Sequence, residues 1–393
     1  MVAYIGFDPT ADSLHVGHLQ QLCLLRRFQA AGHRVIALVG GGTGMIGDPS
    51  GKSEERNLLS TDQLERNRAA IRDQIARFLD PEAPGTAVIA DNFEWLSTAT
   101  LLEFLRDVGK LFSVNEMIRK DSVRARLEGR EQSLSFTEFS YMLLQAWDFV
   151  ELYDRHGCEL QLGGSDQWGN ITEGVDLIRR LRAATAYGLT SPLVTKADGT
   201  KFGKTEAGTV WLDRDRTSPY AFYQFWLRTN DPDVAAYLRR FTMLDRARIE
   251  ELEAALVAHP ERREAPRALA FEMTALVHGR VEAERAEAAS AVLFTDRIDD
   301  LDPDTLASAL ADAPTTHIER AQLAEGLPLT DALVTSGLAS SRNQARQLLA
   351  QGSVYVNGRK AAPDALLGFA DLLHGRWIVL RRGKANQHVL SVG

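Results

Sequence analysis

The segment spanning residues 3–39 sets the strongest limit on the fold of this chain, because it reads as strand, helix, strand. Residues 3–7 are strand-like, and residues 34–39 form a nearly continuous apolar run suited to a strand buried on both faces. Between them we expect a helix with Asp12 or Ser13 as its N-cap and with apolar residues at helical spacing, namely Leu14, Leu19, Leu22, Leu25 and Phe28. The sequence therefore predicts parallel strands joined through a helix.

The same alternation continues over the first half of the chain. Residues 88–90 and 160–162 are weaker strand candidates, and long helical patterns cover residues 63–78 and 136–152. We predict an α/β domain over residues 1–212, with a Rossmann-like doubly wound parallel sheet and a helical connecting insertion. Residues 213–295 are rich in Ala, Glu, Arg and Leu at helical spacing, which predicts an all-helical domain.

The C-terminal part of the chain differs in charge from the rest. Residues 296–326 are acidic and broken by prolines, which predicts a linker. Residues 327–393 combine a helical pattern, short strands and an Asn357-Gly358 turn, which predicts a small α+β domain. This domain carries eight basic and three acidic residues, a net charge of +5 in a chain whose net charge is −8. A basic module on an acidic body indicates contact with a polyanion.

Length and composition exclude several classes of protein. A chain of 393 residues exceeds one hydrophobic core, so more than one domain is expected. The sequence contains no run of about 18 apolar residues, so it predicts no membrane span. Two cysteines, Cys23 and Cys158, make neither a disulfide framework nor a zinc set. With no secretory pattern at Met1, a cytoplasmic setting is the simplest expectation.

Three glycine-rich segments could contact phosphate groups. Residues 42–47 satisfy the G-x-G-x-x-G pattern after a strand, but residues 48–51 (DPSG) interrupt the helix that a dinucleotide fold requires there. Residues 47–53 and 199–205 end in Gly-Lys-Ser and Gly-Lys-Thr, yet each is one residue short of a Walker A loop. These departures argue against a P-loop, and a dinucleotide-dependent oxidoreductase stays only as a third hypothesis.

Two other polar segments fit a triphosphate better. His15 and His18 lie three residues apart in the first helical turn, where we expect free backbone N–H groups and the positive end of the helix dipole. Imidazole donors at that place can stabilise charge on a transferring phosphoryl group. Lys201 and Lys204 belong to a basic loop that could hold a leaving pyrophosphate. Together they predict a site that contacts a nucleoside triphosphate from two sides.

These two segments, HVGH at residues 15–18 and KFGKT at residues 201–205, resemble the HIGH and KMSKS signatures of class I aminoacyl-tRNA synthetases. Their form is similar to that in bacterial-type tyrosyl-tRNA synthetases. The resemblance extends to residues 4–15 (YIGFDPTADSLH), 47–52 (GDPSGK), 139–145 (FSYMLLQ) and 163–170 (GGSDQWGN). It implies a tyrosine–tRNA ligase, which forms tyrosyl-adenylate and pyrophosphate from L-tyrosine and ATP and then transfers tyrosyl to the 3′ end of tRNA(Tyr).

The resemblance also implies a tyrosine pocket. Tyr4 and Asp148 match the positions that contact the phenol hydroxyl. The substrate ammonium would be held by a carboxylate, a phenol and an amide, at Asp48, Tyr141 and Gln145, with Asn92 and Gln167 in support. A phenylalanine would leave the buried partners of the hydroxyl unsatisfied, so hydrogen bonding alone can select tyrosine.

For ATP, the resemblance implies a binding set made of Gly6, Asp8, Gly17, Gly164, Asp166 and Lys204. The transition state would be stabilised by Thr10, His15, His18, Lys201, Lys204 and Thr205. Catalysis would then consist of positioning and electrostatics, without a protein nucleophile. Magnesium would accompany ATP without a dedicated protein cage, and no metal site or prosthetic group is expected.

The basic C-terminal domain resembles a small RNA-binding domain of the ribosome. Its candidate tRNA contacts are Arg342, Arg346, Lys360 and Arg381. The family implies a homodimer. Two alternatives stay open: the sister tryptophan enzyme, and a non-catalytic RNA-binding protein on a synthetase scaffold. The second is suggested by relatives that carry a further segment ahead of the strand with Tyr4, whereas this chain starts at Met1.

Overall fold

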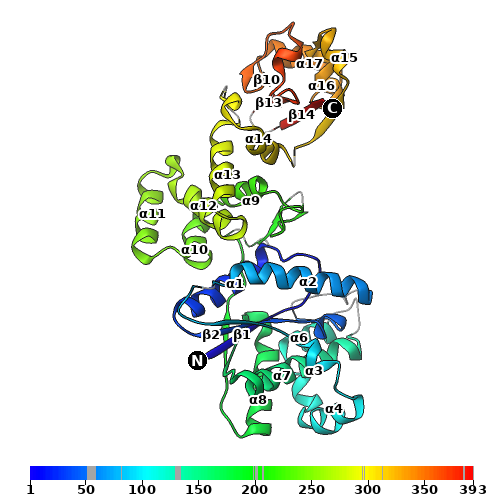
Figure 1. Cartoon of the computed structure of the whole chain (residues 1–393), viewed down its shortest axis with the longest axis vertical. Helices are drawn as coiled ribbons and strands as arrows, with labels where there is room; N and C mark the ends of the chain where they lie inside the picture. The colour runs from blue at the N-terminus through cyan, green and yellow to red at the C-terminus, as the bar shows by residue number, and fades with distance from the viewer. Residues whose placement is uncertain are drawn as a thin grey trace. The chain divides into compact units, whose positions relative to one another are not determined.

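The computed structural model describes residues 1–50, 59–80, 82–128, 134–197, 199, 202–205, 208–293, 295, 297–311, 313–383 and 386–392. By internal contacts the chain divides into two units (Figure 1). The first unit comprises Met1–Asp213 and Ala236–Asp245, and the second comprises Arg214–Ala235 and Arg246–Gly393.

The first unit is built on a five-stranded parallel sheet, as predicted. Its strands are β1 (Val2–Phe7), β2 (Arg34–Val39), β3 (Ala87–Asp91), β4 (Leu160–Gly164) and β5 (Tyr187–Ser191). They lie in the order β3-β2-β1-β4-β5, and each neighbouring pair is parallel. Strand order therefore reverses between β1 and β4, and in such sheets ligands bind at the carboxyl ends of the strands near this reversal.

Helices cover both faces of this sheet. In Figure 1, α1 (Val16–Ala30) and α2 (Thr61–Phe78) lie above it, and α7 (Phe136–His156) and α8 (Trp168–Arg182) lie below. Below the sheet, one core cluster joins β1 and β2 to α7 and α8, through buried residues that include Tyr4, Ile36, Phe149 and Leu177. The site-bearing helix α7 is thus fixed against the central strands.

The first helix begins later than predicted. Its N-cap is His15, whereas the sequence favoured Asp12 or Ser13. The Ser13 hydroxyl is engaged elsewhere, since it donates to the Leu14 carbonyl and accepts from Gln74 Nε2 at 3.1 Å. This contact ties the bend ahead of the helix to α2, from which Gln74 comes.

The connecting insertion between β3 and α7 is helical, as predicted. It contains α3 (Phe93–Leu96), α4 (Leu101–Asp107), α5 (Val114–Met117) and α6 (Asp121–Glu128). Arg126 of α6 donates two hydrogen bonds of 2.9 Å to Glu138 of α7, and each side chain is only 4% exposed. Because a buried charge is costly without its partner, this pair ties the insertion to α7.

The second unit begins with helices and ends in a small mixed domain. The helices are α9 (Pro219–Leu227), α10 (Asp231–Phe241, shared with the first unit), α11 (Arg246–Ala258), α12 (Glu264–His278) and α13 (Arg280–Val292). The C-terminal sheet has the order β11-β10-β13-β14-β8, with β8 (Thr315–Ile318), β10 (Val354–Val356), β11 (Arg359–Lys360), β13 (Trp377–Arg382) and β14 (Asn386–Val392). Strands β9 (Leu327–Pro328) and β12 (Leu366–Leu367) form a separate pair, and the domain's helices are α14 (Pro303–Leu310), α15 (Arg320–Ala324), α16 (Leu329–Thr335) and α17 (Arg342–Ala350).

The structure differs from the linker predicted at residues 296–326. This stretch contains α14, β8 and α15, and β8 pairs in parallel with the last strand β14. The pairing joins segments more than seventy residues apart, at the register Val389–Thr315. Acidity and prolines were the only local signals that the linker prediction used, and a strand completed by a distant partner leaves little local signal. No described helix has the length and hydrophobicity needed to cross a lipid bilayer.

Candidate active site

The side chains predicted to bind tyrosine and ATP come from elements that meet at the carboxyl ends of the strands in the first unit. Strand β1 contributes Tyr4 and Gly6, and the loop after it contributes Asp8 and the exposed Thr10. Helix α7 contributes Tyr141, Gln145 and Asp148. Asp48, Asn92, Asp166 and Gln167 follow β2, β3 or β4, and Gly164 is the last residue of β4.

One hydrogen-bond network connects Asp148 to Asp8. Asn92 Nδ2 donates to Asp148 Oδ2 and to Thr43 Oγ1, both at 2.9 Å. Thr43 Oγ1 donates to Asp8 Oδ1 at 2.8 Å, and the Tyr141 hydroxyl donates to the other Asp8 oxygen at 2.8 Å. Asp8, assigned above to ATP, thus lies beside Tyr141, which was assigned to tyrosine. The residues predicted for the two substrates therefore belong to one network.

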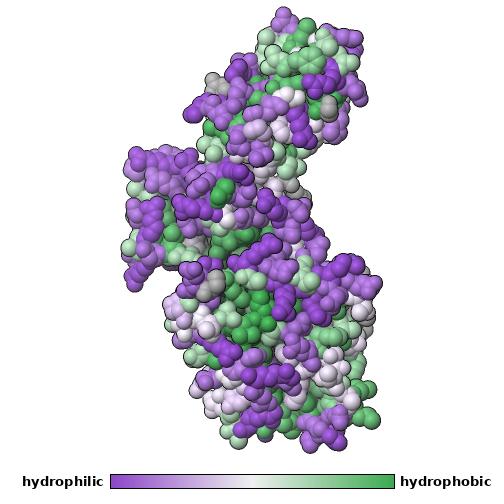
Figure 2. Space-filling view, in the orientation of Figure 1, coloured by the Kyte–Doolittle hydropathy of each residue, from purple (hydrophilic) through white to green (hydrophobic). Residues whose placement is uncertain are grey.

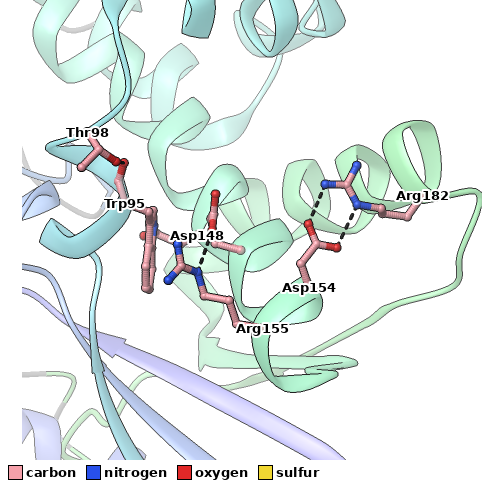
Figure 3. Close-up of polar contacts among 7 residues, drawn as sticks. Trp95, Thr98, Asp148, Asp154, Arg155 and Arg182 are labelled. Carbon is pink, nitrogen blue, oxygen red and sulfur yellow. Dashed lines mark hydrogen bonds and ion pairs between the residues drawn. The ribbon is translucent and has the colours of Figure 1, made fainter.

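Asp148 is a buried carboxyl with two fixed donors. Trp95 Nε1 donates to its Oδ1 at 2.8 Å, and Asn92 Nδ2 donates to its Oδ2. Figure 3 draws Trp95 beside Asp148. Burial raises the pKa of the Asp148 carboxyl to about 8, although both hydrogen bonds act in the opposite direction. A carboxyl so placed can accept a further hydrogen bond only from a group that reaches the pocket floor.

Tyr4 lies near Asp148. Its hydroxyl is buried and has no hydrogen-bond partner within the part of the chain that the structure describes, which is costly unless a ligand supplies one. Burial, and then the nearby Asp148, raise the pKa of the Tyr4 phenol well above its usual value. The hydroxyl therefore stays protonated and can donate. A neutral donor and a buried carboxyl together suit a ligand hydroxyl that both accepts and donates.

A second network holds the other end of the pocket. Gln167 Nε2 donates to Asp48 Oδ2 at 2.7 Å, and Gln145 Nε2 donates to Gln167 Oε1 at 3.1 Å. Asn170 Nδ2 donates to Gln145 Oε1 at 2.8 Å. Burial raises the pKa of Asp166, and the neighbouring Asp48 adds to this. Two carboxylates, Asp48 and Asp166, are close enough to affect one another, which makes this end of the site attractive to a cation.

The histidine pair caps α1. Gly17 N donates to His15 Nδ1 at 3.1 Å, and His15 N donates to His18 Nδ1 at 3.2 Å. Since both Nδ1 atoms accept, the hydrogen-bond network assigns the proton of each neutral ring to Nε2. Burial lowers the pKa of His15, which favours this neutral form. A Cβ on Gly17 would lie 2.7 Å from the His15 ring, so the glycine makes room for the cap.

The expectation of free backbone N–H groups at this helix end is wrong. Val16 N donates to the Val210 carbonyl at 3.0 Å, Gly17 N donates to His15 Nδ1, and His18 N donates to the His15 carbonyl at 2.8 Å. Any hydrogen bond from this turn to a phosphate therefore comes from the two imidazoles rather than from these three N–H groups.

The basic loop is tied to the histidine segment by its flanks. Lys201 lies outside the described residues; Lys204 and Thr205 are described only as the backbone of β6 (Lys204–Thr205), which pairs with β7 (Gly208–Thr209). Gly203 has φ +83° and a Cβ there would lie 2.8 Å from Val16 Cγ2. Trp211 forms an isolated bridge with His15, and their rings meet edge to face at 6.0 Å. The two signature segments are neighbours, as the sequence predicted.

The four candidate tRNA contacts lie in the C-terminal domain of the second unit. Arg342 is engaged with Asp331, with Nε at 2.5 Å, and Arg381 stacks over the Tyr355 ring at 4.0 Å. Arg346 and Lys360 are exposed. Their arrangement leaves these two as the better-placed cations for a phosphate backbone.

Sequence reasoning missed Thr43, Trp95 and Asn170. Thr43 lies in the glycine run that was considered only as a phosphate loop. In the structure, a Cβ on Gly40 would lie 2.0 Å from Asp8 Oδ1, and one on Gly41 would lie 2.4 Å from Asp91 Oδ1. Consecutive glycines after a buried strand were the available signal that polar side chains pass close to the backbone there. Among the described residues, no group of His, Cys, Asp or Glu is arranged to hold a metal ion.

Comparison with known proteins agrees with this geometry. The family described as tRNA synthetases class I (W and Y) matches residues 1–295, and the Tyrosine–tRNA ligase SYY-like C-terminal domain matches residues 305–390. The tyrosine–tRNA ligase of Roseiflexus castenholzii is 53% identical over 392 residues, which cover 99% of this chain and 92% of the relative. That of Geobacillus stearothermophilus is 51% identical over 390 residues, covering 98% and 91%.

A solved structure shares the fold of the larger part of the chain. The C-terminally truncated mitochondrial tyrosyl-tRNA synthetase of Aspergillus nidulans superposes with a TM-score of 0.67 at 33% identity, covering 75% of this chain and 86% of that one. With its parallel sheet, capped histidine pair and matching family models, the chain belongs to the class I tRNA synthetases of the tryptophan and tyrosine type. Its identity to full-length relatives places it in the tyrosine–tRNA ligase family.

The raised pKa of Asp148 predicts a pH dependence of stability. Because this pKa is about 8 in the folded protein and 3.8 for an ordinary aspartate, the folded state binds the proton more tightly. The protonated carboxyl stabilises the folded state fully when the pH is below the ordinary pKa of 3.8, and this stabilisation is lost as pH rises to about 8. We therefore expect the wild type to lose stability relative to Asp148→Asn as pH rises from 3.8 to about 8. The measurement is the difference between their free energies of unfolding in denaturant titrations.

The control is Asp62→Asn, which removes an exposed carboxylate in the first turn of α2. A difference between wild type and Asp148→Asn that is flat with pH would contradict the assignment.

Proposed function

We propose that this protein is a tyrosine–tRNA ligase that uses the site described above. It activates L-tyrosine with ATP and transfers the tyrosyl group to tRNA(Tyr). The observation that carries the proposal is the pairing, on one pocket floor, of the unpartnered Tyr4 hydroxyl with the doubly held Asp148 carboxyl. The phenol of tyrosine donates to Asp148 and accepts from Tyr4.

The acidic end of the pocket receives the substrate ammonium. Asp48, Tyr141 and Gln145 offer a carboxylate, a phenol and an amide oxygen. Gln167 bonds both Asp48 and Gln145, and Tyr141 bonds the carboxylate of Asp8, which supports this assignment. With both ends held, the tyrosine carboxylate points toward the α-phosphorus of ATP. Positioning of this kind removes much of the entropic barrier to a reaction between two substrates.

The activation step needs charge stabilisation rather than a protein nucleophile. A tyrosine carboxylate oxygen attacks the α-phosphorus, the bond to the bridging oxygen breaks, and pyrophosphate leaves with the charge. His15 and His18 donate from Nε2 to the phosphate oxygens, and Lys201 and Lys204 balance the leaving pyrophosphate. ATP enters as its magnesium complex. In the second step a hydroxyl at the 3′ end of tRNA attacks the tyrosyl carbonyl, and AMP leaves.

Tyrosine-dependent exchange of pyrophosphate into ATP tests this function. The wild type should exchange with tyrosine and far more weakly with phenylalanine or tryptophan. Tyr4→Phe should lower kcat/KM for tyrosine by a factor that corresponds to the free energy of one hydrogen bond, about 0.5–1.5 kcal/mol. It should leave kcat/KM for phenylalanine unchanged, because phenylalanine has no hydroxyl to lose a partner.

The matched control is Tyr187→Phe on the edge strand β5, where the ring is exposed. Exchange driven by tryptophan instead of tyrosine would assign the sister activity. Absence of exchange with every amino acid would favour the non-catalytic RNA-binding alternative.

Binding of tRNA is assigned to the basic C-terminal domain. Arg346 and Lys360 are its most accessible candidate cations, and phosphate contacts of this kind are weakened by salt. The double variant Arg346→Gln/Lys360→Gln should raise KM for tRNA in the charging reaction and reduce the slope of its salt dependence by about 2. Pyrophosphate exchange, which needs no tRNA, is the internal control, and a loss of exchange would show that the change acts beyond this domain.

We also propose that the protein is a homodimer and that its interface is the exposed apolar surface of the connecting insertion. Leu102 of α4 is 80% exposed and Phe136 of α7 is 78% exposed, and further exposed apolar residues of the same region are Leu101, Leu105, Val114 and Ile118. Figure 2 shows hydrophobic residues at the lower right of the molecule, where Figure 1 places α4. A patch of this kind is unusual on a monomer, and a second copy can cover it symmetrically.

Leu102→Asp should place a charge in that interface and shift the mass measured by light scattering from the dimer toward the 43.4 kDa of one chain. The control is Val257→Asp on α11, since Val257 is also highly exposed at 85% but lies outside the insertion. A wild-type protein that is monomeric at assay concentration would overturn this proposal.

A further inference from the structure

Arg155 lies at the surface end of α7, two turns after Asp148, and contacts the indole that binds Asp148. Its guanidinium carbon is 5.1 Å from the centre of the Trp95 ring (Figure 3). Its Nε donates to Glu151 Oε2 at 2.8 Å, a pair whose spacing of four residues suits a helix. The Arg155 side chain is 45% exposed, whereas Trp95 is buried.

Trp95 is held at three points. Its Nε1 donates to Asp148 Oδ1 at 2.8 Å, and its carbonyl accepts from Thr98 Oγ1 at 3.0 Å. The third contact is the Arg155 guanidinium on the face of the ring. The Nε1 bond holds one edge of the indole and the Thr98 bond holds only the backbone, while the ring is packed in the core cluster with the Arg155 cation over its face.

Spacing along α7 explains how one indole meets both groups. Asp148 and Arg155 are seven residues apart, which places them on one face of the helix. Trp95 follows β3 in α3 and lies across this face, with its nitrogen toward Asp148 and its ring beneath Arg155. A surface cation is thereby connected to the pocket floor through a single rigid side chain.

We propose that Arg155 is a positioning residue for tyrosine recognition. It holds the Trp95 indole so that the Asp148 carboxyl keeps the orientation that accepts the substrate phenol. This inference rests on the proposed function. Arg155 touches neither substrate in this arrangement, so its removal changes the selection of the amino acid and leaves ATP binding and the chemical step unaltered.

The test is steady-state pyrophosphate exchange by the full-length protein with tyrosine, phenylalanine and ATP varied in turn. Arg155→Ala should raise KM for tyrosine by about two- to fivefold, the range expected from one exposed cation–π contact. The kcat and the KM for ATP should not change, and kcat/KM for phenylalanine should stay at the wild-type value. Arg155→Lys, which keeps a cation over the ring, should recover most of the effect, and Arg155→Gln should not.

The matched control is Arg182→Ala. Arg182 of α8 donates at 2.8 Å and 2.6 Å to Asp154, the residue beside Arg155 on α7, so its loss also removes an arginine ion pair from this helix end (Figure 3). Equal effects of Arg155→Ala and Arg182→Ala on KM for tyrosine would overturn the proposal. A parallel rise in KM for tyrosine and for ATP would overturn it as well.

A double-mutant cycle tests the route through Trp95. Trp95→Phe keeps a ring beneath Arg155 but removes the N–H that binds Asp148. In that background Arg155→Ala should have little further effect on KM for tyrosine, and additive effects would contradict the proposal. If the wild type shows no exchange with tyrosine, the proposed function itself fails; if it exchanges normally and only these variant effects are absent, the role of Arg155 alone is refuted.

Discussion

The buried Asp148 carboxyl is the constraint around which the rest of the site is arranged. A carboxyl that has lost its water needs donors for both oxygens, and here α3, more than fifty residues earlier in the chain, supplies both through its N-cap residue Asn92 and through Trp95. Asn92 in turn binds Thr43, and Thr43 binds Asp8. Satisfying one buried group therefore fixes the loops after β1, β2 and β3 relative to α7.

This arrangement divides the pocket into a neutral end and an acidic end. At the Asp148 end, burial favours the protonated carboxyl and leaves Tyr4 with an unpaired hydroxyl. At the other end, burial raises the pKa of Asp166, and the neighbouring Asp48 adds to this rise. The proposed substrate, with a phenol at one end and an ammonium at the other, would match both ends.

Local patterns in the sequence were sufficient for the α/β fold, because strands buried on both faces and amphipathic helices leave periodic signals. The helix start was predicted too early, since the Ser13 hydroxyl bonds Gln74, sixty-one residues away. The linker was misjudged because β8 depends on β14 for its pairing. The resemblance supplied the candidate substrate contacts, but it did not identify Thr43 and Trp95, which hydrogen-bond to Asp8, Asn92 and Asp148 among those candidates. Roles that depend on a distant partner could not be read from local patterns.

The cap on α1 has a consequence for how such a site can change over time. The first N–H groups of the helix are occupied by His15 and by the Val210 carbonyl, so phosphate contacts from this turn depend on imidazole side chains. A phosphate site formed by backbone N–H groups offers the same donors for any side chains, so it changes only when the loop itself changes shape. Donors carried by side chains can be exchanged one codon at a time. Single substitutions can therefore change the affinity for phosphate in small steps while the helix and the sheet beneath it stay unchanged.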